Sequence, residues 1–426
     1  MVFFLYNVLI IPVLRILVRC TALFNPKLRE REDSWDTTLE LLSSLPPAEY
    51  RVWFHVASMG EFEQAKPIIE HLKAENPDIS IIVSFFSPSG YRHQKHYPLA
   101  DAVVYMPLDT SKKARQFVTA ISPNAAVFIR YELWLNHLAE LSKKKIPVYL
   151  WCATFPRKAI WNFPFFKGFL QKTLGCFTQI YTVGEDETEL FVKANRSLAV
   201  HTAADTRFDR IISVIEKSKD DTPIIPNGYF KPDDTVLVAG STWQKDEEII
   251  IESLNALEQT GQIVRMIIVP HEPTQEHIAT LKNKLLDSVL LSELTEKNSN
   301  KKHIIVDSMG KLLKLYRYAH IVYVGGGFGA GVHSTAEPAG YGVPLVCGEH
   351  ISRSPDAQNL ENLGALTCVS SSKELIEWLL KMTTDKDERS KRGNQAKEYV
   401  YRGAGGSKAA AEIIANNLNV SCPEKS

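Results

Sequence analysis

The chain has 426 residues, enough for two or three domains, and 45% of them are hydrophobic, which supplies ample material for a core. Its 49 Lys and Arg residues balance 49 Asp and Glu residues, and this zero formal net charge argues against a general nucleic-acid binder. The six cysteines are scattered without a C-x-x-C pair, which disfavours a zinc site or a disulfide framework and fits a reducing compartment.

Residues 1–24 predict a membrane anchor. No charged side chain precedes Arg15, and the segment lacks the basic start and small-residue cleavage site of a secretory signal. The run is short for a full span, and Pro12 and Arg15 interrupt it, so we expect an anchor that lies in, or dips into, the membrane interface. A first helix packed on the protein's own core is less expected, because such a helix should show a polar face and residues 1–14 show almost none. Five basic residues follow the first apolar part: Arg15, Arg19, Lys27, Arg29 and Arg31. By the positive-inside rule they place the remaining chain on the cytoplasmic side.

Six apolar runs after the anchor predict the strands of a first domain. They are residues 51–56, 79–86, 102–106, 125–130, 147–152 and 179–183. Helical patterns lie between several of these runs. Because strands that alternate with helices form a parallel sheet covered on both faces, we expect an α/β domain.

A second series of strands follows a linker at 216–233 that is rich in Lys, Asp and Pro. Its apolar runs are 235–239, 264–269, 304–306, 319–327 and 345–348, and the portion from residue 371 reads as helical. Two α/β halves of similar size, with polar turns at their strand ends, predict a ligand cleft between them.

The stretch 323–348 in this second half indicates an anion site. Its strand runs into a glycine-rich turn, 325–331, where glycine tolerates positive φ and lets a ligand approach the backbone. Residues 334–337 have the S-x-x-E spacing of a capping box, opening a helix that Gly342 and Pro344 keep short. Such a loop at the carboxyl end of a strand favours a nucleotide phosphate.

Polar residues at other strand ends extend this candidate nucleotide site. They are 240–242 (Gly-Ser-Thr), 270–271 (Pro-His) and 309–311 (Met-Gly-Lys). Glu337 could accept two hydrogen bonds from a ribose diol, or it could simply cap its own helix.

Glu61 is the candidate general base of the first half. It follows a strand end, where a carboxylate can take a proton from a hydroxyl. Ser58 to Glu61 again has S-x-x-E spacing, so a capping role is equally open. The 12 histidines, His55 among them, show no metal-ligand spacing.

Two further charged residues need partners. Glu132 follows the fourth strand in an apolar, aromatic context, where a partly buried carboxylate requires a partner, either Arg130 or a cation at the acceptor site. Arg207 lies between Asp205 and Asp209 and either pairs with one of them, the commoner case, or faces a phosphate.

Six segments make the chain resemble the 3-deoxy-D-manno-octulosonic acid (Kdo) transferases of lipopolysaccharide synthesis. They are FHVASMGE (54–61), YELW (131–134), DTRFD (205–209), GSTW (240–243), DSMGKL (307–312) and the stretch 323–348. They follow the family's order and cover nearly the whole chain. The resemblance implies the GT-B fold, with two Rossmann-like domains facing a central cleft. We therefore expect an anchor at 1–24, an acceptor domain at 25–215 and a donor domain with C-terminal helices at 216–426.

The resemblance also implies an activity. The family transfers Kdo from CMP-Kdo to a lipid A precursor of the lipid IVA type with inversion, and it needs no metal or cofactor for catalysis. We expect an enzyme held by its N-terminus at the cytoplasmic face of the inner membrane. The run Lys27, Arg29 and Arg31 would favour the anionic membrane surface and the phosphorylated acceptor.

Matching motifs carry the family's site residues onto this chain. Glu61 matches the catalytic base, and Glu132 and Arg207 match positions that stabilise the transition state. The CMP-contacting positions are Pro270, His271, Met309, Gly310, Lys311, Ser334, Thr335, Ala336 and Glu337. Four of the carried residues depart from the family's usual choice: Arg207 replaces Lys, which changes the geometry of the charge, His271 replaces Arg, Lys311 replaces Glu and Ser334 replaces Asn.

Two alternative functions stay open from the sequence. One is another GT-B enzyme that uses a UDP-sugar, either a transferase or an epimerase, and nucleotide preference separates it from a CMP-Kdo enzyme. The other is a membrane-bound nucleotide-binding module without catalysis. The acidic residues at 61 and 132 and the cation at 207 argue against the second.

Overall fold

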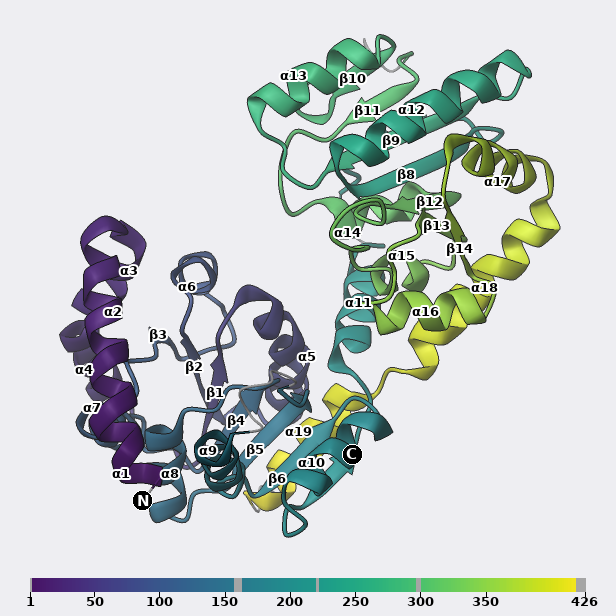
Figure 1. The fold of residues 1–426 in the computed structure, drawn as a ribbon. Helices are drawn as coiled ribbons and strands as arrows, with labels where there is room; N and C mark the ends of the chain where they lie inside the picture. The colour runs from purple at the N-terminus through teal and green to yellow at the C-terminus, as the bar shows by residue number, and fades with distance from the viewer. Residues whose placement is uncertain (1, 157–162, 220–221, 296–299, 419–426) are drawn as a thin grey trace. The chain divides into compact units, whose positions relative to one another are not determined.

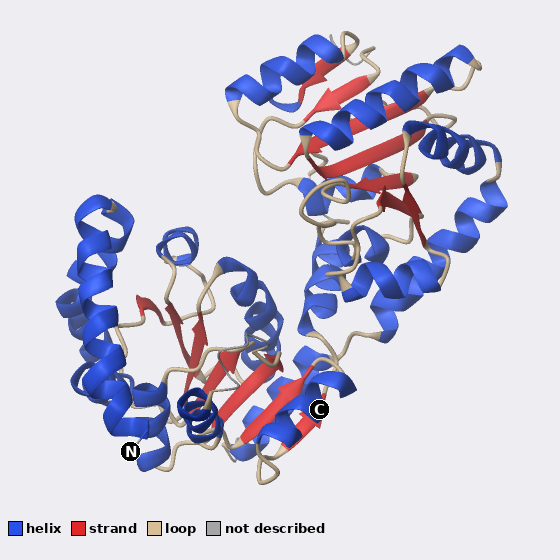
Figure 2. Cartoon of the chain, viewed as in Figure 1, coloured by secondary structure: helices blue, strands red, loops and turns tan. Residues whose placement is uncertain are grey.

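The computed structural model describes residues 2–156, 163–219, 222–295 and 300–418. The chain forms two compact units (Figure 1). Unit 1 comprises the chain up to Arg210 together with the C-terminal segment from Ala404, and unit 2 runs from Ile211 to Gly403. Figure 2 shows one sheet in each unit with helices packed around it.

The sheet of unit 1 is parallel and has seven strands in the order β3-β2-β1-β4-β5-β6-β7. Chain order reverses between β1 and β4, and the crevice at their carboxyl ends is where open α/β sheets bind ligands. The strands are β1 (Arg51–Val56), β2 (Ser80–Phe85), β3 (Ala102–Tyr105), β4 (Ala125–Ile129), β5 (Val148–Ala153), β6 (Gln179–Thr182) and β7 (Val200–Thr202).

The helices that belong wholly or partly to unit 1 surround this sheet, and α11 continues beyond Arg210 into unit 2. They are α1 (Val2–Leu5), a π-helical turn (Tyr6–Ile10), α2 (Ile11–Phe24), α3 (Pro26–Asp33), α4 (Trp35–Ser43), α5 (Met59–Glu75), α6 (Pro88–Gln94), α7 (Ser111–Ile121), α8 (Leu135–Lys143), α9 (Pro164–Leu174), α10 (Glu185–Ala194), α11 (Thr206–Lys217) and α19 (Gly406–Asn417).

The sheet of unit 2 repeats this plan with the order β10-β11-β9-β8-β12-β13-β14, again parallel. Its strands are β8 (Thr235–Thr242), β9 (Val264–Pro270), β10 (Ser288–Leu290), β11 (His303–Ile305), β12 (Ile321–Val324), β13 (Leu345–Gly348) and β14 (Leu366–Val369). The α-helices are α12 (Gln244–Gln259), α13 (Gln275–Lys284), α14 (Leu312–Leu315), α15 (Ala336–Gly340), α16 (Pro355–Asn362), α17 (Ser372–Thr384) and α18 (Lys386–Arg402). Chain order reverses between β8 and β12.

The expected strands are all present, but β7, β10 and β14 were not foreseen. Each has only three or four residues and lies at an edge of its sheet. Two of them, VHT in β7 and SVL in β10, are too short to stand out as apolar runs.

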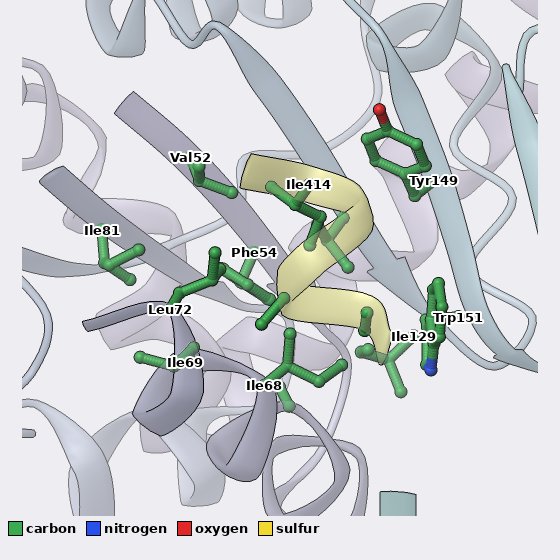
Figure 3. Close-up of a cluster of buried hydrophobic side chains, with 14 of the residues drawn as sticks. Val52, Phe54, Ile68, Ile69, Leu72, Ile81, Ile129, Tyr149, Trp151 and Ile414 are labelled. Atoms are coloured by element: carbon green, nitrogen blue, oxygen red, sulfur yellow. The ribbon is translucent and has the colours of Figure 1, made fainter. Parts of the chain in front are cut away.

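The C-terminal helix α19 corrects the expected domain boundary, because it packs in unit 1 rather than with residues 216–403. Figure 3 shows Ile414 of α19 beside Phe54 of β1 and the side chains of α5 in one buried cluster. Asp209 accepts hydrogen bonds from the backbone N–H groups of Gly405 (2.8 Å) and Ser407 (3.2 Å) at the start of α19. An apolar helical stripe does not tell which of two similar sheets it covers, so the sequence could not predict this.

The N-terminal helical segment, Val2–Phe24, is long and apolar enough to cross a membrane by length and composition. Its beginning nevertheless packs on the rest of unit 1, in contrast to the expectation that this helix would not pack on the protein's own core. The Tyr6 hydroxyl donates to Asp109 (2.8 Å) and the Asn7 amide donates to Asn136 (3.0 Å). Tyr6 and Ile11 also pack in a small cluster with Leu135 of α8. The segment is thus docked at one end and exposes apolar residues along the rest of its length.

Candidate active site

Glu61 lies in the first turn of α5, directly after the carboxyl end of β1. Its carboxylate is buried, with 3% of the residue exposed. The oxygen Oε2 accepts hydrogen bonds from the backbone N–H groups of Ala57 and Ser58, so the capping role does exist. Within the described ranges no hydrogen bond to Oε1 is present, and this second oxygen is available to a substrate hydroxyl.

The surroundings of Glu61 tune its acidity. Burial and the negative charge of Glu132 raise the pKa of Glu61 to about 7, against the opposing effect of the two backbone donors and of Arg130. A carboxylate with a pKa near neutrality combines a useful ionised fraction with real basicity, which suits a general base.

Glu132 follows β4, the strand next to β1 in the sheet. It is 7% exposed, and its Oε2 accepts a hydrogen bond from the indole N–H of Trp134 (2.6 Å). The Nε2 atom of His55 lies 3.5 Å from the same oxygen. Arg130, the expected partner, makes no ion pair with Glu132 in the part of the chain that the structure describes. Sheet order thus brings the two predicted carboxylates into electrostatic contact.

His55 on β1 is fully buried, and its neighbours define its tautomer. The hydroxyl of Ser84 receives the indole N–H of Trp53 (2.8 Å) and lies 2.9 Å from Nδ1 of His55. We assign the proton of this buried hydroxyl to Nδ1 as acceptor. This assignment places the imidazole proton on Nε2, which faces Glu132 without a hydrogen bond. Burial lowers the pKa of His55, so the ring is neutral at pH 7.

Arg207, the third predicted catalytic residue, lies in the first turn of α11 and pairs with Asp205. Its Nε and Nη2 atoms lie 2.7 Å from Oδ2 of Asp205. The hydroxyl of Thr206 donates to the backbone carbonyl of Gln64 (2.8 Å), one turn beyond Glu61 on α5. The structure thus realises the commoner interpretation, a local ion pair, and ties the start of α11 to α5. The Arg207 side chain remains 42% exposed.

The glycine-rich turn of unit 2 is packed against its own backbone. A Cβ atom on Gly325 would lie 2.2 Å from the carbonyl oxygen of Ser241, and one on Gly327 would lie 2.5 Å from the backbone nitrogen of Gly348. Gly326 has φ of +91°. These glycines are required by close approach of neighbouring strand ends, a demand that exists without any ligand.

Asp246 in the first turn of α12 anchors this turn, and the sequence interpretation missed it. It is 1% exposed and accepts hydrogen bonds from the N–H groups of Gly326 (2.9 Å) and Trp243 (2.9 Å) and from the hydroxyl of Tyr323 (2.8 Å). The signal available beforehand was the spacing of Trp243 and Asp246, which matches an N-cap and its N3 residue.

Three aromatic rings stack at the strand ends of unit 2. The His271 and His333 ring centroids are 4.4 Å apart, and the Trp243 centroid lies 4.7 Å from that of His271. The Trp243 indole N–H donates to Nε2 of His333 (3.0 Å). Burial and the neighbouring His271 lower the pKa of His333. Trp243 and His333 were absent from the predicted site, yet they contact a predicted residue. We call these three residues the aromatic stack.

The structure places the other predicted CMP positions around two turns. Pro270 ends β9, immediately before His271, and Ser334–Glu337 follows His333. The expected capping box at 334–337 is wrong: α15 begins after Thr335, without a side-chain cap. Because α15 has only five residues, its dipole is small.

The turn Met309-Gly310-Lys311 precedes α14. Met309 is 71% exposed and Gly310 has φ of +81°. Among the described residues no hydrogen bond joins this turn to the aromatic stack. Its predicted place at the nucleotide therefore remains a prediction.

Comparisons with known proteins bear on this arrangement. A family model for 3-deoxy-D-manno-octulosonic-acid transferase (kdotransferase) matches residues 29–210, ending where the first segment of unit 1 ends. A 3-deoxy-D-manno-octulosonic acid transferase of Haemophilus influenzae is 24% identical over 390 residues, covering 87% of this chain and 88% of the relative. One of Aquifex aeolicus is 27% identical over 350 residues, covering 81% and 89%.

Two solved structures resemble the chain in fold. A UDP-GlcNAc 2-epimerase from Neisseria meningitidis has a TM-score of 0.62 at 14% identity, covering 87% of this chain and 100% of that one. The Acinetobacter baumannii MurG structure has a TM-score of 0.51 at 12% identity, covering 86% and 99%. Likeness at these identities concerns fold alone. Together with the two parallel seven-stranded sheets, it confirms the expected GT-B fold.

Proposed function

Since this chain belongs to the 3-deoxy-D-manno-octulosonic-acid (Kdo) transferase family, we propose that it transfers Kdo from CMP-Kdo to a lipid A precursor of the lipid IVA type. As a member of that family it is a glycosyltransferase of lipopolysaccharide biosynthesis. The observation that carries the finer proposal is Glu61, a buried carboxylate in the unit that the family model matches, whose Oε1 accepts no hydrogen bond from any described residue.

In the proposed reaction Oε1 of Glu61 accepts the proton of the acceptor sugar hydroxyl. The hydroxyl oxygen attacks the anomeric carbon of Kdo as the bond to the CMP phosphate breaks, which inverts the configuration. Glu132 and Arg207 stabilise the charges of the transition state, as their motif positions suggest. The proton transfer is worth about 10²- to 10⁴-fold in rate by the usual contribution of a positioned base.

The donor nucleotide is assigned to unit 2. The proposed contacts with CMP come from two groups, the strand-end residues Pro270 and His271 and the turn residues Met309, Gly310, Lys311, Ser334, Thr335, Ala336 and Glu337. The ordered glycine turn supports this assignment, because its backbone is held rigidly at a strand end, where α/β sheets receive phosphates. The aromatic stack offers a flat face for a base.

We further propose that the enzyme works at the cytoplasmic face of the inner membrane, attached through Val2–Phe24. The support is the length and apolar character of that segment, together with the membrane-bound nature of a lipid acceptor.

A turnover assay tests the proposal. The purified protein is incubated with CMP-Kdo and a lipid A precursor, and the products are analysed by mass spectrometry. The expected result is addition of Kdo to the lipid with release of CMP. Thermal stabilisation by UDP but not by CMP would instead favour a UDP-sugar enzyme.

The transfer rate should depend on pH through Glu61. A base must be ionised to act, and the pKa of Glu61 is about 7. The value of kcat/KM is therefore expected to rise about tenfold per pH unit below pH 7 and to level off above it. A profile that is flat between pH 5.5 and about 8 would contradict the role of Glu61 as base.

A further inference from the structure

A pocket of about 960 Å³ lies in unit 1 between α2, α3, α4 and α7, outside the site described above. Its walls carry five cationic side chains, from Arg15 and Arg19 of α2, Arg29 of α3, and Lys112 and Lys113 of α7. Three acidic residues also line it: Glu32, Asp33 and Asp36. The positive charges therefore outnumber the negative ones.

Most of the cations around this pocket form no ion pair with the described residues. Within the ranges that the structure describes, Arg15, Arg19, Lys112 and Lys113 form no ion pair. Arg29 donates to the backbone carbonyl of Leu23 (2.8 Å). The acidic residue Glu32 is engaged by Arg31, at 3.0 Å. A group of like charges around a hollow repel one another, and an anion bound there would relieve this repulsion.

Of the run Lys27, Arg29 and Arg31, which was expected to face the membrane, only Arg29 lines the pocket. Arg31 is buried, with its guanidinium 4.2 Å above the ring of Phe86. Lys113, by contrast, faces the pocket 5.0 Å from the ring of Trp35. Burial lowers the pKa of Lys113, and the positive charges of Arg15, Arg31 and Arg19 lower it further, against the opposing negative charge of Glu32.

The apolar side of α2 indicates which kind of surface lies beside the pocket. Val13, Ile16 and Leu17 are each more than half exposed on the helix that carries Arg15 and Arg19. The bond from Tyr6 to Asp109 fixes the start of this helical segment on unit 1. A helix lying in the membrane interface would therefore bring the pocket to the level of the lipid headgroups.

We propose that this pocket binds the phosphate of an anionic lipid at the membrane surface. The inference rests on the proposed membrane-bound function and adds a specific phosphate site to it. Unpaired Arg and Lys side chains from two helices suit a phosphate, and the neighbouring apolar face of α2 suits acyl chains rather than a soluble anion.

Vesicle binding tests this site without catalysis. The variant Lys112→Gln/Lys113→Gln removes two pocket charges but leaves α2 intact. With phosphatidylcholine vesicles containing about 30% phosphatidylglycerol, the lipid concentration for half-maximal binding is expected to rise about tenfold. The matched control, Lys143→Gln/Lys144→Gln, removes two exposed charges at the end of α8, outside the pocket, and should change it less than about twofold.

Equal losses in the two variants would overturn the proposal, since diffuse surface charge would then explain the binding. No loss in the pocket variant would overturn it as well. Phosphatidylcholine vesicles carrying a phosphorylated glucosamine-disaccharide lipid distinguish the acceptor's phosphate from that of a bilayer phospholipid as the ligand. Because binding is measured without donor, failure of this proposal leaves the turnover assay unaffected.

A separate observation concerns the buried histidine of unit 1. We infer that His55 is a positioning residue that holds the carboxylate of Glu132 in place for the proposed transfer reaction. The hydroxyl of Ser84, oriented by Trp53, keeps the imidazole proton on Nε2, 3.5 Å from Oε2 of Glu132. Of the charged and titratable groups nearby, Glu132 and His137 act on the ring.

The inference is tested by measuring the pH profile of the transfer rate in two variants, His55→Leu and His55→Gln. His55→Leu removes the imidazole N–H, whose attraction for Glu132 acts across 3.5 Å without a hydrogen bond, and should lower kcat at least tenfold, with the KM for CMP-Kdo unchanged. A displaced Glu132 would repel the charge of Glu61 less, so the midpoint of the pH profile should also fall. His55→Gln restores an N–H near the Nε2 position and should recover most of the rate.

Ser84→Ala offers a milder variant if His55→Leu does not fold, because it frees the tautomer while keeping the ring. Ser84→Ala should also lower the midpoint of the pH profile of transfer. A wild-type profile in both Ser84→Ala and His55→Leu would overturn the inference, whereas failure of the proposed function would appear as absent transfer in the wild-type protein.

Discussion

Replacing Glu61 by Gln is expected to lower the rate of Kdo transfer at least a hundredfold, because the amide cannot accept the proton of the acceptor hydroxyl. Binding of CMP, measured by calorimetry or thermal shift, should be unchanged, since the donor is assigned to unit 2. The substitution separates the base role from the capping role. The amide oxygen of Gln can still accept from the N–H groups of Ala57 and Ser58, as Oε2 of Glu61 does.

Stability measurements at two pH values supply the control for this variant. The pKa of Glu61 is higher in the folded chain than its ordinary value, so the folded state is destabilised as pH rises through about 7. Gln is neutral throughout and avoids this loss. The Glu61→Gln variant should therefore melt at a higher temperature relative to wild type at pH 8 than at pH 5.

Glu75→Gln is a matched substitution at the other end of α5 and should leave transfer unchanged. Transfer at near wild-type rate in Glu61→Gln would exclude Glu61 as the base. It would leave the capping interaction as the reason for a glutamate at this position.

The sequence predicted the surroundings of Glu61 along the chain but not across the sheet. An apolar run followed by S-x-x-E was enough to place the residue at a strand end, and both interpretations of it, cap and base, are compatible with the structure. Its electrostatic neighbour Glu132 is far away in the sequence and follows β4. Only the strand order, which pairs β1 with β4, shows that one carboxylate raises the pKa of the other.

The glycine turn shows a second limit of prediction from the sequence. Glycines were expected where a ligand approaches the backbone, but Gly325 and Gly327 are already required by neighbouring backbone in the absence of any ligand. Composition cannot distinguish these causes, because both demand the absence of a Cβ atom. Likewise, S-x-x-E spacing formed a capping box at Glu61 but not at Glu337, where α15 starts one residue later than the motif requires.

Asp246→Ala is expected to destabilise unit 2 by about 3 to 5 kcal/mol, because it leaves buried donors without an acceptor. The N–H of Gly326, the N–H of Trp243 and the hydroxyl of Tyr323 all lose their partner. The glycine turn would no longer be held at the end of β12. Affinity for CMP should therefore fall at least tenfold, measured by titration below the melting temperature of the variant.

Asp246→Asn is the matched control, because asparagine removes the negative charge but keeps the size of the side chain and most of its hydrogen bonds. Its amide oxygen can take the place of Oδ2, which accepts both backbone N–H groups, while its NH₂ group can donate to the Tyr323 oxygen. Only the Tyr323 proton then loses its acceptor, so the loss of stability should be about 1 to 2 kcal/mol. If Ala and Asn were equally harmful, the charge of Asp246 would be its essential property. If neither changed melting or CMP affinity, the glycine turn would be held by its own backbone packing, and Asp246 would have no part in the proposed donor site.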